Sequence, residues 1–372
     1  MADRAGRVPR VGILTFFEAN NCGANLQALA LTEAVEELGC DCEIVRYAKE
    51  PPQKAPTVRA KKNTLQSRMA AAALTLLRRR RKAKFVEFRR KYMKISDRQY
   101  IGEEISEANA RYDVFVTGSD QVWNYSLSGS DDAYFLDFVL PPARKCSYAP
   151  SFGTYRSHSP EALARIKEEL SDFYAISVRE NEGVEMVREI AGREAARVPD
   201  PVFLRTAQRW MALAEPKTQK KPFVFLYTIK SPRPAMLELI RRICAKRKWD
   251  VIVYQKQLRR QIAGKYVSTL DPREFLGYLR DARIVLTDSY HGTVFSILFH
   301  KNFWSFRGTY QNTRDARIEE VLQIYGLEDR LVDAELPPDP FLQANHSDTD
   351  QTVQVERERG LEFLRKICNL RE

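Results

Sequence analysis

The chain has 372 residues, of which 44% are hydrophobic and 29% are charged, and its formal net charge is +11. Single cores stop growing at roughly 250 to 300 residues, so we expect two domains, and the composition excludes a largely disordered chain. The positive charge favours anionic partners, which include phosphorylated substrates, acidic lipid surfaces and nucleic acid.

The cysteines and the N-terminus bear on the cellular compartment. Six cysteines are scattered along the chain without a CxxC pair, which indicates reduced thiols rather than a disulfide framework or a zinc site. The basic N-terminus is followed by a short apolar run, residues 11–17, which is not the core and cleavage site of a signal peptide. No stretch reaches the roughly 18 to 20 apolar residues of a membrane span. These features predict a cytoplasmic protein.

The first half alternates short apolar runs with amphipathic stretches, a pattern that predicts strand–helix–strand units around a mostly parallel sheet. Residues 11–16 form the first predicted strand, a helix that ends at Gly39 follows, and residues 43–47 form the second strand. A right-handed crossover makes these two strands parallel. Further strands of the first half are predicted at residues 113–117, 145–149 and 174–178.

A basic helix is predicted between the second and third strands. It follows residues 51–63, which are rich in Pro, Lys and Ala and predict a loop. Its cations lie within residues 78–91, and apolar side chains are expected on the opposite side of the helix: Leu76, Leu77, Phe85 and Phe88. Residues 78–91 form either a solvated helix face or a peripheral contact with an anionic membrane surface or lipid-linked substrate at the inner face of the membrane. No nucleic-acid partner is expected.

The pattern breaks between residues 198 and 222, where prolines and a polar stretch predict the connection between two domains. We predict one domain at residues 1–210, a second at residues 211–345, and a C-terminal helix within residues 346–372. This last helix is expected to pack on the first domain.

The second half repeats the alternation of strands and helices. Pro272 opens one predicted helix, another starts at Gly292, and a third contains Met236 and Ile243. The strands of this half are predicted at residues 223–227, 251–254 and 283–287.

Ligands of open α/β sheets bind beyond the carboxyl ends of the strands, where loops lead into helix N-termini. Two such loops lie in the first half. In the loop after the first strand, Asn21, Gly23 and Asn25 suit a turn, a helix cap or the close approach of a ligand, although any such loop favours these residue types.

The loop after the strand at residues 113–117 carries hydroxyl, amide, carboxylate and indole groups that can bind a sugar: Ser119, Asp120, Gln121, Trp123 and Asn124. The structural alternative is that Ser119 or Asp120 caps a helix while Trp123 lies in the core. The sequence fits both interpretations.

Arg179 ends the strand at residues 174–178. Its forked, permanently charged side chain suits a carboxylate or a phosphate, and the alternative is an internal ion pair with Glu180 or Glu182.

His291 is one of four histidines and lies immediately before a predicted helix, in a loop that also contains Asp288, Ser289 and Tyr290. A histidine can change protonation near neutral pH, and a helix N-terminus favours an anion. The other three histidines lack such neighbours: His158, His300 and His346. The sequence contains no metal-ligand spacing, no P-loop, no GxGxxG and no nucleophile elbow. It therefore predicts an anion site without a metal or organic cofactor.

These same segments resemble the polysaccharide pyruvyl transferase family. The resemblance spans roughly residues 11–330 in consistent order and is carried by residues 12–16, 20–28, 118–124, 148–153, 176–180 and 287–293. It implies an α/β fold of two Rossmann-like domains facing across a cleft, similar to the GT-B glycosyltransferases. It also implies transfer of the enolpyruvyl carbons of phosphoenolpyruvate onto two hydroxyls of a sugar in exopolysaccharide or cell-wall biosynthesis. The products are a cyclic ketal and phosphate.

The resemblance implies roles for particular residues. Arg179 would hold the carboxylate or phosphate of the donor, and His291 would protonate the methylene carbon or the phosphate, with Asp288 as a second catalytic residue. The second domain would supply the remaining donor contacts: Ser289, Tyr290, Gly292 and Thr293. The first domain would bind the sugar or lipid-linked oligosaccharide through Asn21, Gly23, Asn25, Ser119, Asp120, Gln121, Trp123 and Asn124. Replacing Arg179 or His291 by Ala is expected to abolish turnover and leave the fold intact.

One position departs from the family pattern. Characterised members carry an Arg two positions before the motif His, whereas this chain has Ser289 there. The loss removes a charge-assisted contact to an anionic donor. Other cations of the second half that can supply the charge are Arg259, Arg260, Arg283, Lys301, Arg307 and Arg317. Two further hypotheses follow: a glycosyltransferase that uses a nucleotide sugar, and a glycan-binding protein without catalysis.

Overall fold

The computed structural model describes residues 7–50, 64–153, 159–216, 219, 221–229, 232–254, 261–307, 309–310, 313–314, 316–333 and 335–369. The predicted loop at residues 51–63, His158, Arg259 and Arg260 lie outside the described residues. The chain forms two compact units. Unit 1 comprises Met1–Gln53, Arg89–Arg205 and Gln354–Glu372, and unit 2 comprises Lys54–Phe88 and Thr206–Val353.

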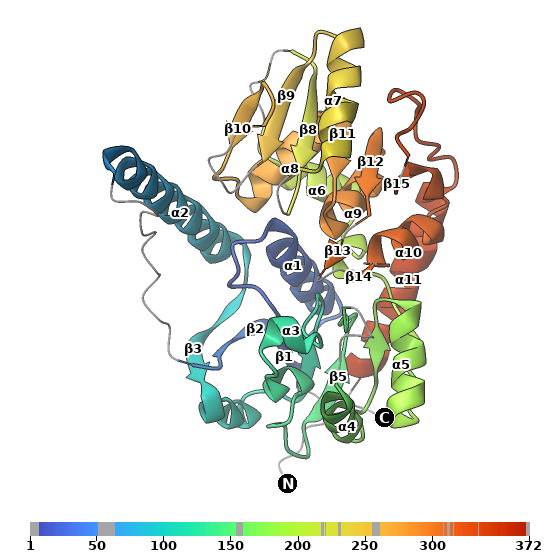
Figure 1. Cartoon of the computed structure of the whole chain (residues 1–372). Helices are drawn as coiled ribbons and strands as arrows, with labels where there is room; N and C mark the ends of the chain where they lie inside the picture. Colours follow the sequence, from blue (N-terminus) through green and yellow to red (C-terminus); the bar gives the residue numbers. More distant parts are fainter. Residues whose placement is uncertain are drawn as a thin grey trace. The chain divides into compact units, whose positions relative to one another are not determined.

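Unit 1 is built on a five-stranded parallel sheet (Figure 1). Its strands are β1 (Arg10–Leu14), β2 (Asp41–Ala48), β3 (Ile95–Ile101), β4 (Val114–Thr117) and β5 (Arg144–Ser147), in the order β3-β2-β1-β4-β5. Four predicted strands are confirmed, and β3 was not predicted. The predicted strand at residues 174–178 is shorter: β6 (Ser177–Val178) pairs with β7 (Ala196–Arg197) in a separate two-stranded sheet.

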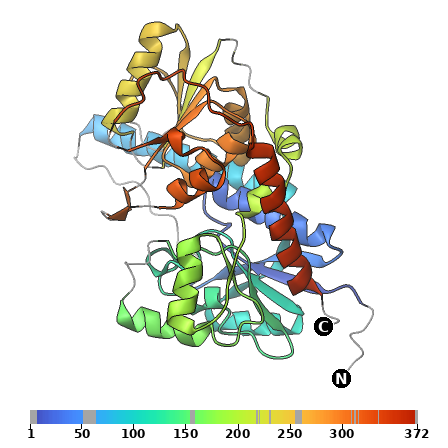
Figure 2. The same ribbon diagram turned by 90° about the vertical axis from the view of Figure 1, so that its right-hand side faces the viewer.

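Helices cover this sheet. They are α1 (Cys22–Glu37), α3 (Tyr125–Ser128), α4 (Pro160–Glu169), α5 (Asn181–Ala191), the 3₁₀ turns η1 (Gly102–Ala110), η2 (Asp132–Phe135) and η4 (Pro201–Phe203), and α11 (Thr349–Cys368). The C-terminal helix α11 lies along unit 1 (Figure 2), where Leu364 and Ile367 join the core cluster of Val11 and Ile13. The prediction that the last helix packs on the first sheet is therefore confirmed.

Unit 2 is built on a six-stranded parallel sheet. Its strands are β8 (Phe223–Tyr227), β9 (Asp250–Tyr254), β10 (Lys265–Val267), β11 (Ile284–Thr287), β12 (Phe303–Phe306) and β15 (Leu331–Val332), in the order β10-β9-β8-β11-β12-β15. The three predicted strands of this half are confirmed. A two-stranded antiparallel pair, β13 (Thr309–Tyr310) and β14 (Thr313–Arg314), follows β12.

The helices of unit 2 are α6 (Ala207–Leu213), α7 (Pro234–Lys246), α8 (Pro272–Asp281), α9 (Tyr290–Leu298), α10 (Arg317–Ile324) and the 3₁₀ turn η5 (Glu328–Arg330), together with most of α2 (Leu65–Tyr92). The first part of the predicted connection, residues 198–216, contains η4 and α6, and its Trp210 is fully buried. The prediction that a helix starts at Gly292 is corrected, because α9 starts at Tyr290 and His291 lies in its first turn.

Both sheets share one topology. Each follows the Rossmann strand order, in which the chain reverses direction across the sheet at a switch point, and ligands bind beside the strand ends there. The switch point lies between β1 and β4 in unit 1 and between β8 and β11 in unit 2. The predicted α/β class with parallel sheets and a C-terminal helix is confirmed.

Candidate functional site

At the switch point of unit 1, buried hydrogen bonds join the loops after β1 and β4. Thr15 Oγ1 donates to the carbonyl of Ser119 at 3.0 Å. Gln27, from α1, donates through Nε2 to Thr15 Oγ1 at 2.9 Å and accepts from the backbone N–H of Ser119 at 3.2 Å. Gln27 therefore fixes the two loops relative to each other, a role that the sequence analysis did not assign.

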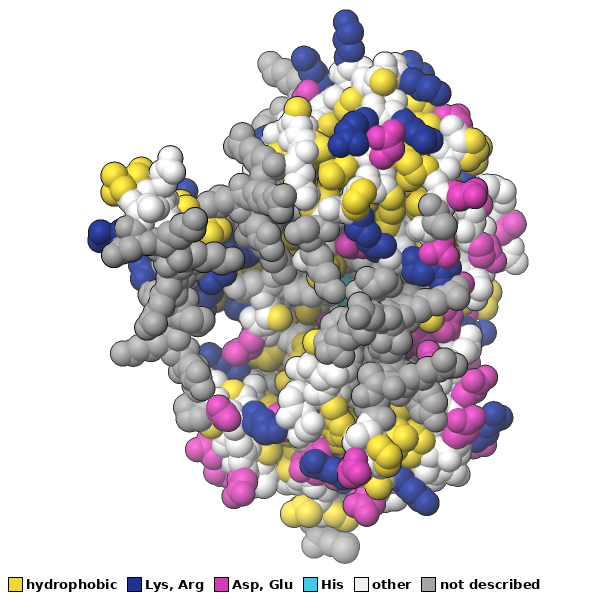
Figure 3. All heavy atoms as spheres, in the orientation of Figure 1, with side chains coloured by type: hydrophobic (Ala, Val, Ile, Leu, Met, Phe, Trp, Pro, Cys, Tyr) yellow, Lys and Arg dark blue, Asp and Glu magenta, His cyan; other side chains and the backbone are white. Residues whose placement is uncertain are grey.

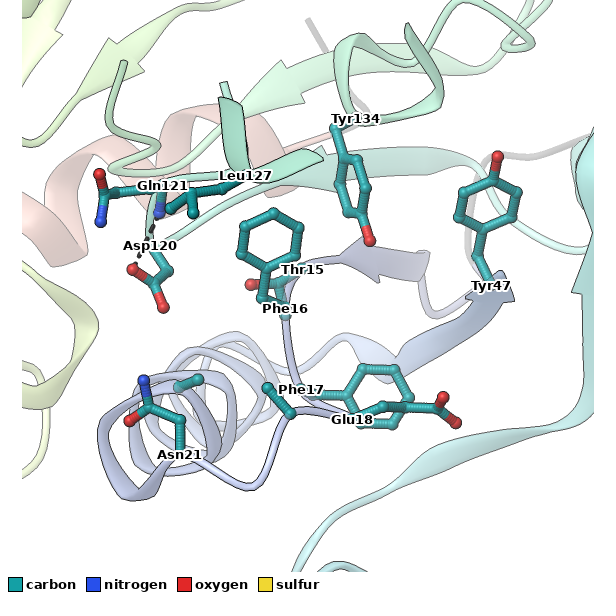
Figure 4. A pocket seen from close by; sticks show the side chains of 12 residues that line it. Thr15, Phe16, Phe17, Glu18, Asn21, Tyr47, Asp120, Gln121, Leu127 and Tyr134 are labelled. Atoms are coloured by element: carbon teal, nitrogen blue, oxygen red, sulfur yellow. Dashed lines mark hydrogen bonds between the residues drawn. The ribbon is translucent and has the colours of Figure 1, made fainter. Parts of the chain in front are cut away.

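These loops enclose a pocket of about 470 Å³. Figure 4 shows Asp120 and Asn21 pointing toward one another on one side of Phe16, with Tyr134 and Tyr47 on the other side. The pocket is lined by Thr15, Phe16, Phe17, Glu18, Ala19, Asn21, Ala24, Tyr47, Asp120, Gln121, Leu127 and Tyr134. Three residues of the predicted acceptor set, Asn21, Asp120 and Gln121, are thus brought together.

The pocket combines aromatic rings with carboxylates. Tyr47 donates its hydroxyl to Asp131, whose two carboxylate oxygens both lie 3.1 Å away. Burial, followed by the negative charge of Asp131, raises the pKa of Tyr47 well above its ordinary value, and burial likewise raises the pKa of Tyr134. Both phenols therefore stay neutral and can donate or accept hydrogen bonds. Glu18 pairs with Arg46 at 3.2 Å.

Asp120 has an unusual backbone conformation. Its φ is +68°, in the left-handed region that few residues other than Gly adopt, although Asp tolerates it better than most. Its backbone carbonyl accepts from the N–H of Ser151 at 2.8 Å, and its Oδ1 accepts from the N–H of Gln121 at 2.9 Å. These bonds hold the carboxylate of Asp120 at the pocket wall (Figure 4).

Five predicted acceptor residues lie behind the wall of the pocket and are corrected to supporting positions. All five are buried: Gly23, Asn25, Ser119, Trp123 and Asn124. Trp123 stacks on Phe135 with 5.1 Å between ring centroids and has no exposed surface, so it cannot stack on a sugar. Asn25 donates to the carbonyls of Ala19 and Asn21, both at 2.9 Å, and so shapes the loop that faces the pocket.

Arg179 is buried in an ion-pair cluster of unit 1. Its Nε donates to Glu180 Oε1 at 2.7 Å and its Nη1 to Asp200 Oδ2 at 2.9 Å. The side chains of Arg179 and Asp200 are 2% and 0% exposed. The predicted alternative, an ion pair with Glu180, is therefore present, and Asp200 is a further partner that the sequence did not indicate. An Ala at this position would leave buried carboxylates, so we expect its replacement to cost stability as well as turnover.

At the switch point of unit 2, the predicted motif forms the first turn of α9. Ser289 is the N-cap, and its side chain accepts from the N–H of Gly292 at 3.3 Å. Gly292 packs so closely on β11 that a Cβ would lie 2.3 Å from Thr287 Oγ1. Thr293 Oγ1 lies 2.7 Å from Ser305 Oγ, so Thr293 faces the protein interior. His291 is 7% exposed, and its ring meets that of Tyr290 edge to face.

Asp288 joins the two loops at this switch point, since its Oδ1 accepts from the N–H of Ile229, which follows β8, at 2.9 Å. Arg233, the N-cap of α7, extends from the same loop, and its Nη2 donates to the carbonyls of Phe306, at 3.4 Å, and Arg307. These carbonyls end β12, the strand next to β11. Both acceptors are neutral, so they do not cancel the charge of Arg233, which the sequence analysis did not single out.

Four of the cations named as substitutes for the family Arg lie in the described residues: Arg283, Lys301, Arg307 and Arg317. Arg283 and Lys301 precede β11 and β12, so they lie at the amino edge of the sheet. His291 follows β11, whose four residues separate the two edges by about 13 Å. Arg307 lies on the same edge as His291 and forms ion pairs with Glu319 at 2.8 Å and Asp333 at 3.1 Å. Arg317 begins α10.

The described part of the chain contains neither a metal-ligand cluster nor a membrane-spanning helix. No three His, Cys, Asp or Glu side chains among the described residues are grouped so that they could hold a metal ion. Within the same ranges, no helix combines the length and apolar character needed to cross a membrane.

Two units with the Rossmann strand order, each with polar loops at its switch point, define an α/β protein of two Rossmann-like units. The family model for polysaccharide pyruvyl transferase matches residues 21–309, so the chain belongs to the polysaccharide pyruvyl transferase family and is a transferase. This confirms the resemblance noted in the sequence. No curated protein matches the chain by sequence.

Solved structures share the fold at low sequence identity. A putative UDP-N-acetylglucosamine 2-epimerase from Listeria monocytogenes has a TM-score of 0.51 and 11% identity, covering 96% of this chain and 91% of that one. UDP-GlcNAc 2-epimerase from Neisseria meningitidis bound to UDP-GlcNAc has a TM-score of 0.47 and 12% identity, covering 97% and 94%. Arabidopsis thaliana UGT89C1 complexed with UDP-L-rhamnose has a TM-score of 0.46 and 11% identity, covering 98% and 100%. The Listeria structure establishes likeness of fold.

Proposed function

We propose that this transferase moves the pyruvyl group of phosphoenolpyruvate onto two hydroxyls of a sugar in a cell-surface polysaccharide or its lipid-linked precursor. Family membership supports the class of reaction. The proposal places the reaction in the cytoplasm and uses phosphoenolpyruvate as a substrate, without a cofactor.

The pocket of unit 1 is the observation that carries the proposal. Its aromatic rings suit the C–H faces of a sugar, and its amide and carboxylate groups suit hydroxyls. Asp120 repels an anion, whereas the charge of Glu18 is balanced by Arg46, so the pocket favours the neutral acceptor over phosphoenolpyruvate, which carries a carboxylate and a phosphate. We assign acceptor contacts to Asn21, Asp120 and Gln121.

The anionic donor suits the switch point of unit 2. The N-terminus of α9 offers backbone N–H groups and the positive end of the helix dipole. Arg233 lies on the same edge of the sheet, and its observed hydrogen bonds go to neutral carbonyls, which do not cancel its charge. We therefore assign it the role of the family Arg, which Ser289 cannot fill. His291 and Tyr290 complete the donor side, and Asp288 fixes the loop through Ile229.

The proposed reaction balances without a co-reactant. His291 donates a proton to the methylene carbon of phosphoenolpyruvate, and the first sugar hydroxyl attacks the adjacent cationic carbon as it loses its proton. The C–O bond to phosphate then breaks, and the second hydroxyl closes the ketal. One of the two hydroxyl protons returns to His291 and replaces the proton that His291 gave to the methyl group. The other hydroxyl proton leaves with the phosphate.

One observation favours a second candidate, a glycan-binding protein without catalysis. Ser289 replaces the family Arg, and Arg179 is held by two carboxylates, so two expected donor contacts are altered while the sugar pocket is retained. This candidate predicts saccharide binding without affinity for phosphoenolpyruvate.

Thermal stabilisation by ligands separates these candidates. A ligand that binds only the folded state at 100 times its Kd adds about 2.7 kcal/mol of stability, which raises Tm by about 5 to 11 °C. We expect this shift with phosphoenolpyruvate and none with UDP-sugars or GDP-sugars. His291→Ala should remove it, and Arg233→Gln should weaken binding about 10- to 100-fold, because a charge-assisted contact is lost. The matched control is Arg241→Gln, since Arg241 is 63% exposed on the same helix α7.

The contrary outcomes are distinct. A shift with a nucleotide sugar alone would replace the proposal by a glycosyltransferase. No shift with any donor, together with saccharide binding that Asp120→Asn weakens, would replace it by the glycan-binding protein. An Arg241→Gln effect as large as that of Arg233→Gln would refute the placement of the donor charge.

A further inference from the structure

An apolar stripe lies on the exposed side of α2. Leu65, Met69 and Leu76 are 74%, 64% and 51% exposed. Their spacings of four and seven residues place them on one face of the helix, because 3.6 residues make one turn. Figure 3 shows hydrophobic side chains beside Lys and Arg side chains at the outer end of α2.

A different face of α2 turns toward the protein. Ala71, Arg81, Phe85 and Phe88 are buried, and Lys84 forms an ion pair with Glu274 at 2.7 Å. Phe85 and Phe88 were expected on the same apolar side of the helix as Leu76, but they are buried in the protein interior. The exposed stripe is a second apolar face rather than the packing face of the helix.

Cations continue the same exposed face. Arg79 and Arg80 lie one turn beyond Leu76 and are exposed, and no acidic residue occurs between Leu65 and Val86. Residues 78–91, predicted as a peripheral membrane contact, therefore do not form one continuous exposed cationic face. Arg81, Lys84 and Arg89 turn inward, since Arg89 lies 3.3 to 3.5 Å from the carbonyls of Phe17 and Glu18 and from Asn25 Oδ1.

We propose that this outer face of α2, formed by Leu65, Met69, Leu76, Arg79 and Arg80, docks on the surface of an anionic phospholipid bilayer. A bilayer offers both an acidic surface for the arginines and an acyl boundary for the apolar stripe, as interfacial amphipathic helices require. Nucleic acid would satisfy the arginines and leave three large apolar side chains in water. The biological purpose of this docking rests on the proposed function, because a lipid-linked acceptor lies at such a surface.

Vesicle co-sedimentation of the full chain tests the docking. We expect partition onto vesicles of phosphatidylcholine with 30% phosphatidylglycerol, and about 25-fold weaker partition for the double variant Arg79→Gln, Arg80→Gln, at roughly fivefold per charge. The triple variant Leu65→Gln, Met69→Gln, Leu76→Gln should weaken it at least about tenfold.

Matched controls for the two variants are Arg241→Gln with Arg242→Gln on α7, and Leu140→Gln, whose Leu is 62% exposed in unit 1. These controls should leave partition unchanged. Far-UV circular dichroism and Tm verify that every variant is folded, which is expected because the changed side chains are exposed.

Three results would overturn the inference. Absence of binding by the native chain is the first. The second is an α7 variant that weakens binding as much as the α2 arginine variant, which would assign the attraction to the overall charge of +11. The third is full binding by the apolar variant together with tight, arginine-dependent binding of a 20-base-pair duplex, which would make the face a polyanion site. Vesicle binding needs neither donor nor acceptor, so a negative vesicle result does not contradict the proposed transferase activity. In the same way, a negative result for donor binding does not contradict the docking of α2.

Discussion

Replacing Arg179 by Ala should damage stability before it can report on catalysis. The guanidinium forms two ion pairs, with Glu180 and Asp200, and the Asp200 side chain is fully buried. Removing the cation leaves both carboxylates in a poorly hydrated interior with no compensation from Arg179. Protonation of one carboxylate would relieve part of the repulsion at the cost of the hydrogen bonds that it accepts.

The expected loss is large compared with the stability of an ordinary domain. Breaking a buried ion pair by removing one partner costs about 3 to 5 kcal/mol, because the remaining charge is uncompensated. At about 2 to 4 °C per kcal/mol for a unit of this size, Tm of unit 1 should fall by about 6 to 20 °C. Urea unfolding followed by circular dichroism measures the loss directly.

A charge-neutral triple variant separates stability from donor binding. Arg179→Met combined with Glu180→Gln and Asp200→Asn removes all three charges, and the Asn can still cap η4 by accepting from the N–H of Val202. We expect its stability to lie within about 2 kcal/mol of the native chain. If Arg179→Ala costs less than about 1 kcal/mol, the account of the buried cluster is refuted. If the stable triple variant loses the shift with phosphoenolpyruvate, the charged cluster around Arg179 is needed for donor binding, as the family resemblance implies.

Two further predictions concern unit 2. Gly292→Ala should cost about 1 to 3 kcal/mol, because its Cβ would lie 2.3 Å from Thr287 Oγ1, and an unchanged Tm would contradict the close packing of α9 on β11. Burial lowers the pKa of Lys301 to about 8 in the folded chain, whereas the pKa of an unfolded Lys is about 10.4. Below pH 8 the buried charge therefore destabilises the folded state. This penalty is lost as the pH rises toward 10. Lys301→Met should therefore raise Tm at pH 7 and raise it less at pH 10, and an equal gain at both values would refute this sign.

The sequence predicted the central strands well, for a physical reason. β1, β8 and β11 are continuous apolar runs flanked by turn-forming or polar residues, as strands covered on both faces require. β3 was missed because it lies at the edge of its sheet, where Asp97, Arg98 and Gln99 are tolerated beside solvent. Its pattern therefore lacks the apolar run that marks an interior strand.

The pocket was only partly predictable. Asn21, Asp120 and Gln121 lie directly after strands, so the rule for ligand sites in parallel sheets indicates them. Tyr47 also ends a predicted strand, and the same rule indicates it. Tyr134 gives no such signal, because it lies in a 3₁₀ turn and reaches the pocket through packing between residues distant in sequence. Asp200, the second partner of Arg179, was hidden for the same reason.

The departure at Ser289 changes more than one charge. Ser289 caps α9 through the N–H of Gly292, a bond that a guanidinium, which has donors and no acceptor, cannot form. The family Arg would therefore bring a cation and leave that N–H without this partner, whereas Ser289 stabilises the helix and supplies no charge. A donor site in this chain would then need its cation from a neighbouring loop, and the proposed cation is Arg233, which caps α7 after β8 and donates to carbonyls at the end of β12.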